Sequence, residues 1–77
     1  MEDLLEYLAK GLVDSPDDVE VDSFEEDDGT VVLELHVAPD DTGKVIGRGG
    51  RTVAALRVVM KAAAARDGNR VLVDVVD

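Results

Sequence analysis

Hydrophobic and polar residues follow two different periods along the chain, and the changes of period divide it into predicted helices and strands. Leucines recur at helical spacing over residues 1–12 with acids in the first turn, and Ser15-Pro16 closes this short amphipathic helix. From residue 50 or 51 to residue 66 the pattern is helical again. Its apolar residues fall within one arc of the helix, namely Val53, Leu56, Val59, Met60, Ala63 and Ala64.

Three other segments have the pattern of β-strands. In residues 19–25 valines alternate with acids, but Phe24 falls one position out of phase, so we expect a β-bulge or a register change there. In residues 31–37 the valines and leucines at odd positions share one face, and Pro39 ends the strand. Residues 70–77 are mostly apolar and form the third strand. Asp28-Gly29 predicts a hairpin between the first two strands, with a loop longer than two residues because residues 25–28 are all acidic.

The remaining local signals predict one short helix and a turn. Residues 40–47 favour one or two helical turns, with Asp40, Asp41 or Thr42 as the N-cap. Gly68, in the turn at residues 67–69, suits a left-handed backbone conformation. The order is therefore helix, strand, strand, short helix, glycine-rich turn, long helix and strand. This order predicts an α+β fold, and a chain of 77 residues makes one domain.

Charge is distributed unevenly along the chain. The formal net charge is −10, yet residues 1–43 hold fifteen acids against one base, whereas residues 44–77 hold seven bases against three acids. The average charge argues against a polyanionic partner, but the charge of the second half does not. Acid-rich surfaces often only maintain solubility. That explanation does not account for the gathering of the bases after Gly43.

Composition argues against several classes of function. Without cysteine the chain forms neither a disulfide framework nor a thiolate metal site, and a single histidine excludes most histidine-based metal sites. No apolar stretch approaches the ~20 residues that span a bilayer, and the N-terminus lacks the pattern of a secretion signal. We therefore expect a cytoplasmic protein without membrane contact.

No set of residues in the sequence argues for catalysis. His36 has no nucleophile or convergent acid pair that can be assigned to it, so we interpret it as an ordinary surface residue. The adjacent carboxylates fall mostly at loops and caps, where they are neither an acid–base pair nor a metal site. We expect no enzyme activity and no cofactor.

Residues 43–52, GKVIGRGGRT, hold four of the seven glycines and three of the eight basic residues. They do not match a Walker A loop, which needs G-x-x-x-x-G-K-[ST]. They do not match a Rossmann fingerprint either, which needs G-x-G-x-x-G after a strand. What remains is an apolar-G-x-x-G-x-x-apolar pattern that joins a short helix to a long one.

This pattern, from Ile46 to Val53, resembles the GxxG loop of the KH domain, a fold that binds single-stranded nucleic acid. The KH core of strand, helix, GxxG, helix and strand matches residues 30–76 in order. The helix and strand of residues 2–25 supply what the type II arrangement places before that core. The resemblance implies a type II KH fold over residues 1–77, with a three-stranded mixed sheet packed against three helices. The chain looks like the small stand-alone bacterial KH proteins of the KhpA kind.

The residue types in the loop suit contact with RNA. Glycines at positions 47 and 50 let a sugar–phosphate backbone approach the main chain, and the N–H groups that start the next helix then face phosphate. A GxxG loop clamps about four nucleotides. Basic side chains add charge-assisted contacts, and aliphatic side chains form a floor for the bases. The expected RNA-binding residues are Lys44, Val45, Ile46, Gly47, Arg48, Gly49, Gly50, Arg51, Thr52, Val53 and Arg57.

Alternative interpretations stay open beside this one. A tight helix–helix turn can need its glycines for packing alone. The fold can also serve as a protein-interaction or dimerisation module whose acidic surface docks a partner, with RNA contact incidental. On the leading hypothesis the ligand is single-stranded RNA. One module with few phosphate contacts binds weakly, so we expect a second module, through a homodimer or a partner protein. The resemblance implies that this partner is a second, larger KH-containing RNA-binding protein.

Overall fold

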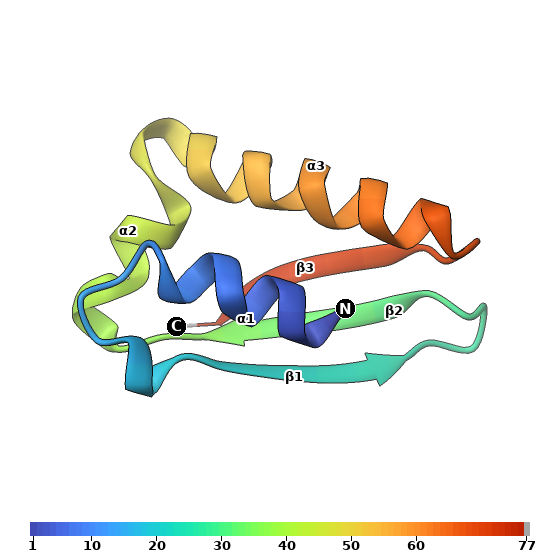
Figure 1. Cartoon of the computed structure of the whole chain (residues 1–77), viewed down its shortest axis with the longest axis horizontal. Helices are drawn as coiled ribbons and strands as arrows, with labels where there is room; N and C mark the ends of the chain where they lie inside the picture. Colours follow the sequence, from blue (N-terminus) through green and yellow to red (C-terminus); the bar gives the residue numbers. More distant parts are fainter. Residues whose placement is uncertain (77) are drawn as a thin grey trace.

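The computed structural model describes residues 1–76, which form helices and strands in the predicted order (Figure 1). These are α1 (Glu2–Lys10), β1 (Glu20–Glu25), β2 (Val31–His36), α2 (Thr42–Ile46), α3 (Arg51–Arg66) and β3 (Val71–Val76). Three short 3-10 turns lie between them: η1 (Pro16–Asp18), η2 (Pro39–Asp41) and η3 (Arg48–Gly50). The predicted α+β fold class is confirmed. None of the helices in the described part of the chain is long and apolar enough to cross a membrane.

The strands form a mixed sheet in the order β1-β2-β3. β1 pairs with β2 antiparallel, whereas β2 and β3 are parallel and are joined through α2 and α3, because parallel strands need a long crossover. The pairing of β1 runs without interruption from Glu20–His36 to Glu25–Val31. The bulge expected at Phe24 is therefore wrong. Phe24 is out of phase with Val21 because it lies on the opposite face of the sheet, across from Val32.

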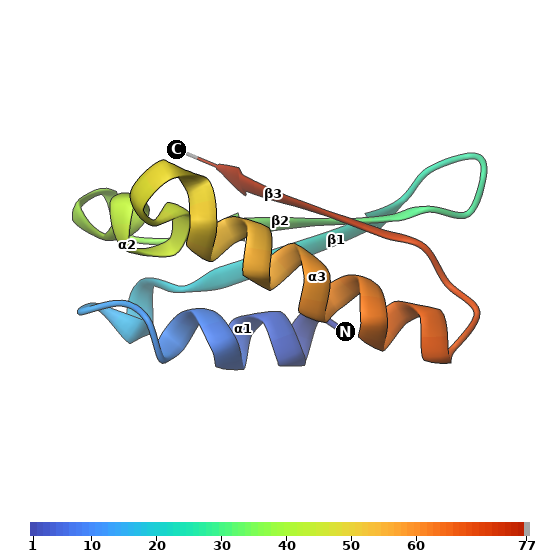
Figure 2. The same cartoon turned by 90° about the horizontal axis from the view of Figure 1, so that it is seen from above.

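Helices α1 and α3 cover one face of the sheet, and within residues 1–76 no helix covers the other (Figures 1 and 2). The core lies between this helical layer and the covered face. Its largest fully buried side chains come from both helices, the central strand and α2, namely Leu5, Leu33, Leu35, Met60 and Val45. Val71 and Val73 add the covered face of β3. The covered face is thus the one that the alternation in residues 31–37 predicts.

The long helix follows its predicted apolar arc except along one edge, where Ala63 is only partly buried. Val53, Leu56, Met60 and Ala64 are buried, but Val59 is 44% exposed. Val59 lies at the edge of the arc, where the side chains of Leu8 and Leu12 border a surface hollow with it and leave it partly uncovered. The two aromatic residues also lie outside the core, since Tyr7 is 75% exposed and Phe24 49%.

The turns follow the chemistry of their residues. The hairpin loop after β1 is longer than two residues, as expected. It closes through two hydrogen bonds: the N–H of Glu26 donates to the Thr30 carbonyl, and the N–H of Thr30 donates to the Asp28 carboxylate. The hydrogen bonding of Thr30 to the Asp28 carboxylate, together with the charge of Arg70, holds the pKa of Asp28 below its ordinary value. Gly68 has φ +74° after α3, which confirms the predicted left-handed turn.

Candidate nucleic-acid interface

The glycines of the loop between α2 and α3 have different physical roles. Gly47 ends α2 with φ +77° and ψ 169°, a backbone region that is almost restricted to glycine. A Cβ at this position would overlap the Thr52 side chain and lie 2.9 Å from the Thr52 backbone nitrogen. Gly49 and Gly50 also have positive φ, but a Cβ on either would point into open space. Packing therefore requires glycine at position 47, whereas positions 49 and 50 leave the main chain accessible.

The start of α3 is open to an anion. Gly50 is its N-cap residue in the left-handed conformation, and no side chain caps the first turn. The Gly50 N–H donates to the Gly47 carbonyl at 3.1 Å, which folds the loop back against the end of α2. The first N–H groups of a helix have no partner within the helix, and its dipole favours negative charge there. The geometry therefore suits a phosphate or another anion at the loop.

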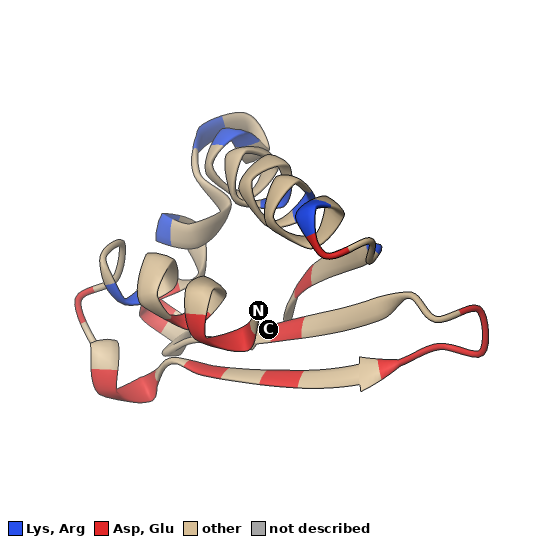
Figure 3. Ribbon diagram, turned by 45° about the vertical axis from the view of Figure 1, so that its right-hand side comes forward, with Lys and Arg blue, Asp and Glu red and all other residues tan. Residues whose placement is uncertain are grey.

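The basic residues lie mainly along α3 and the loop before it, whereas the acids lie along β1, the hairpin and the N-terminal segment (Figure 3). Arg48 and Arg51 are exposed, and neither makes an ion pair within residues 1–76. Arg57 is anchored, because its Nε donates to the Val73 carbonyl at 3.1 Å. This bond ties α3 to β3 and leaves the rest of the guanidinium at the surface.

Lys44 is already paired on the other side of α2. Its Nζ lies 3.1 Å from an Asp14 carboxylate oxygen and 3.5 Å from Asp41. The hydrogen bond and charge of Asp14, with a further contribution from Asp41, hold the pKa of Lys44 above its ordinary value. Lys44 thus joins α2 to the loop after α1, and in this structure its ammonium is paired on that side of α2.

Asp41 has a role that the sequence did not indicate. It precedes α2, but its carboxylate does not cap that helix. Instead it accepts hydrogen bonds from the N–H groups of Asp14 at 3.2 Å and Ser15 at 3.0 Å. Burial alone would raise the pKa of Asp41, but these two donors and the Lys44 ammonium hold it below the ordinary value of 3.8. Asp41 therefore fastens the loop between α1 and η1 to the start of α2.

The aliphatic floor differs from the prediction in two ways: it lacks Val45, and it includes residues of β3. Val45 is fully buried and packs in the core, whereas Ile46 is 36% exposed and Val53 is 8% exposed. Ile46 and Val53 line a cavity of about 460 Å³, whose other walls are Arg57, Glu34, Asp74, Val75 and Val76. Sequence reasoning missed this wall on β3. The parallel pairing of β3 with β2, which no local pattern specifies, brings it beside α3.

This cavity continues along the space between α3 and the free edge of β3. A second cavity, of about 250 Å³, shares Arg57 and Asp74 with the first and adds Lys61 and residues 71–73. We call the two together the α3–β3 groove. It begins beside the glycine loop, at Ile46 and Val53, and is lined by apolar side chains with two bases, Arg57 and Lys61, and two acids, Glu34 and Asp74.

One further group of polar residues lies on the uncovered face of the sheet. Asp22, Glu34 and His36 each have a potential ligand atom within 4.8 Å of the others. His36 Nε2 lies 3.1 Å from an Asp22 carboxylate oxygen, so an ion pair across β1 and β2 forms when the imidazole is protonated. His36 is thus half-buried beside a carboxylate rather than freely exposed, and its buried Nε2 has no hydrogen-bond partner within residues 1–76.

Comparisons with known proteins agree on one family. A family model described as "KhpA/KhpB, KH domain" matches residues 2–75. The RNA-binding protein KhpA of Clostridium acetobutylicum is 49% identical over 76 residues, which make up 99% of this chain and 100% of that protein. The proteins of the same name from Halalkalibacterium halodurans and Streptomyces coelicolor are 53% and 54% identical, and the matches cover all of this chain and 100% and 92% of theirs. No solved structure matches the chain significantly.

Proposed function

Because the chain belongs to the KhpA/KhpB family of KH domains, we propose that it binds single-stranded RNA and clamps the phosphate backbone with the loop of residues 47–50. The similar proteins are bacterial and are named for RNA binding. The family is not one of enzymes, and the prediction that the chain is no enzyme is confirmed. The observation that carries the clamp is the exposed glycine loop at the open start of α3, with two arginines that make no ion pair within residues 1–76.

The residues near the loop divide into those that contact RNA and those that position the loop. Arg48 and Arg51 contact phosphates, and the main chain at Gly49 and Gly50 allows the backbone to approach. Ile46, Val53 and the β3 wall of the groove pack against bases. Gly47 and Thr52 fix the bend between the helices, Val45 fills the core below it, and Lys44 and Asp41 hold α2 in place.

One such module binds RNA weakly and acts with a second. The GxxG clamp touches about four phosphates, which gives a slope of log K against log salt of about −3 for single strands. The net charge of −10 lowers the affinity further. A second copy of this chain or a larger KH-containing RNA-binding protein supplies additional contacts, because linked sites multiply the effective affinity.

The test is fluorescence anisotropy with a short oligouridine over a salt series, with circular dichroism to check the fold. The loop variant is Arg48→Asp with Gly49→Asp. Gly49 has φ +64° and open space for a side chain, and Asp tolerates this conformation better than most residues. The control is Arg66→Asp with Gly68→Asp, which makes the same chemical change at another exposed arginine and another left-handed glycine with open space.

With an oligouridine of about four nucleotides, we expect the loop variant to lose binding at about 150 mM salt while the control keeps most of it. Arg66 lies about 22 Å of helix from Arg51 at the loop, well beyond the Debye length of about 8 Å, and so short an RNA does not reach it. Equal binding by the folded loop variant and the control would refute the clamp. If the unmodified chain does not bind RNA even at low salt, the proposal that the isolated domain binds RNA is refuted as well.

A second candidate function, docking of a protein, rests on the uncovered face of the sheet. Phe24 and Leu72 are 49% and 51% exposed there and lie on either side of buried Val32, in one row across the three strands. The next row consists of Asp22, Glu34 and Asp74. An apolar row beside an acidic row suits a basic partner better than a second copy of the same acidic face. Phe24→Ser would weaken such docking and leave RNA affinity unchanged, which separates the two functions.

A further inference from the structure

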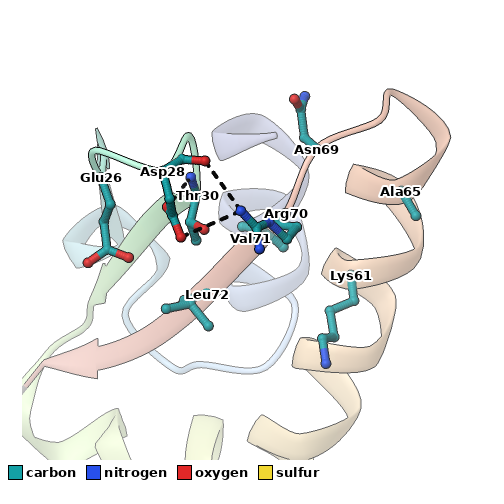
Figure 4. A pocket seen from close by; sticks show the side chains of 9 residues that line it. All are labelled: Glu26, Asp28, Thr30, Lys61, Ala65, Asn69, Arg70, Val71 and Leu72. Atoms are coloured by element: carbon teal, nitrogen blue, oxygen red, sulfur yellow. Dashed lines mark hydrogen bonds and ion pairs between the residues drawn. The ribbon is translucent and has the colours of Figure 1, made fainter.

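A larger cavity lies beyond the α3–β3 groove, at the end of α3 farthest from the glycine loop. Its volume is about 510 Å³, and it is bounded by the hairpin loop, the start of β3 and the last turns of α3 (Figure 4). Figure 4 shows Glu26 and Asp28 on the hairpin side, Lys61 extending from α3 on the other side, and Leu72 of β3 between them. No sequence signal pointed to this place, and the clamp does not use it.

The cavity is continuous with the groove that the clamp opens into. It shares Lys61, Val71 and Leu72 with the middle cavity, which in turn shares Arg57 and Asp74 with the cavity at the loop. Ten residues of α3 separate Arg51 from Lys61, or about 15 Å of helix. A strand that is clamped at the loop and follows the groove therefore reaches the cavity after the nucleotides that the loop holds.

The charges in the cavity favour a base over a phosphate. Asp28 is engaged by Arg70, whose Nη2 lies 3.5 Å from its carboxylate and 3.3 Å from its carbonyl oxygen. Glu26 and Lys61 are exposed, and neither makes an ion pair within the described residues. The two acids and two bases that line the cavity balance, so there is no net positive charge to attract a phosphate, whereas a free carboxylate accepts hydrogen bonds from the N–H groups of a base. Leu72, which is 51% exposed, offers an apolar surface for the base to lie on.

We propose that this cavity is an additional subsite of the RNA-binding groove and that it receives a guanine base. Guanine has two adjacent N–H donors, at N1 and N2, for the Glu26 carboxylate, and two adjacent acceptors, O6 and N7, for the Lys61 ammonium. Uracil and cytosine lack the pair of adjacent donors, and adenine lacks it as well. The inference rests on the proposed function, because the same strand must be clamped at the loop.

The experiment measures anisotropy with oligouridines of about four to eight nucleotides, and with the longest oligomer carrying one guanosine at each position in turn. We expect affinity to rise with length beyond about four nucleotides. A guanosine at one preferred position should add about tenfold, near the lower end of what one bidentate base contact provides. Adenosine or cytidine at that position should add less than guanosine does.

Two matched variants identify the carboxylate. Glu26→Gln keeps the shape of the side chain but loses the acceptor pair, whereas Glu25→Gln makes the same charge change at an exposed neighbour that does not line the cavity. We expect Glu26→Gln alone to abolish the guanosine preference. Glu25→Gln should bind plain oligouridine as well as the unmodified chain or slightly better, because it removes one negative charge outside the cavity.

The outcomes separate this inference from the proposed function. Binding that depends on the loop arginines but gains nothing from length or guanosine overturns the subsite and leaves the clamp intact. A guanosine preference that survives Glu26→Gln overturns the assignment of the cavity as its source. If loop variants bind as well as the unmodified chain, the clamp itself fails, and the subsite fails with it.

Discussion

At the scale of single residues, glycine performs two distinct tasks within four positions. Gly47 is needed because the chain turns sharply against Thr52, and no Cβ fits there. Gly49 and Gly50 have left-handed conformations in open space, where the cost of a side chain is conformational rather than steric. The hypothesis of a tight turn that needs glycine only for packing therefore describes Gly47 well but does not describe its neighbours.

This difference predicts unequal costs for two alanine substitutions. Gly49→Ala should lower the free energy of unfolding by about 1–2 kcal/mol, the cost of a left-handed conformation for alanine. Gly47→Ala should cost at least about 3 kcal/mol, because backbone strain adds to the contact with the Thr52 nitrogen. Urea denaturation followed by circular dichroism measures both. Equal losses would show that the start of α3 shifts easily to accept a Cβ at position 47.

At the scale of elements, a buried carboxylate joins parts that are distant in sequence. Asp41, at the end of η2, accepts backbone hydrogen bonds from the loop that follows α1, and Lys44 of α2 completes the contact. The start of α2, the helix that leads into the clamp, is thus held by residues 26 and 27 positions away along the chain. This contact fixes α2 relative to α1 and so supports the loop that follows α2.

The contact predicts a pH-dependent difference between Asp41→Asn and the unmodified chain. The pKa of Asp41 lies below 3.8 in the folded protein, so its stabilising contribution is complete above that value and disappears as the pH falls through the folded pKa. Asp41→Asn should therefore have a lower urea midpoint at pH 7, and the difference should narrow toward pH 3. Asp40→Asn, at an exposed neighbour, serves as the control and should show no such difference. A constant gap between pH 7 and pH 3 would exclude the charge of Asp41 as the cause.

The order of elements, the hairpin, the arc of α3 and the glycine loop were all predictable, because each depends on spacing or turn chemistry within a short window. The errors have a common cause in tertiary pairing. The bulge at Phe24 is wrong because Phe24 lies on the far face of the sheet, opposite Val32 of β2, and the pattern of β1 alone does not show that an apolar side chain packs there. Val59 belongs to the apolar arc, but α1 covers only part of that arc. The partners of Lys44 and the β3 wall of the groove also lie far away in sequence.

At the scale of the whole molecule, the two signs of charge lie on different sides. The bases follow α3 and its loop, beside β3, whereas many acids lie along β1 at the opposite edge of the sheet (Figure 3). The molecule measures 34 × 21 × 18 Å. The Debye length is about 30 Å at 0.01 M salt and about 8 Å at 0.15 M. At low salt an RNA in the groove therefore senses the distant acids, and at physiological salt it senses mainly the local bases.

This screening predicts that Asp17→Asn with Asp18→Asn, in the exposed turn before β1, tightens RNA binding only at low salt. Two charges acting on about four phosphates across a molecule 21 Å wide should weaken affinity about fourfold at 0.01 M and only slightly at 0.15 M. Anisotropy at both salt concentrations measures the ratio. A gain that persists at 0.15 M would mean that these acids act at short range, on RNA that passes beside β1 rather than along α3. Such a result would place the bound RNA beside β1, because physiological salt screens the charges of this turn before their field reaches the groove.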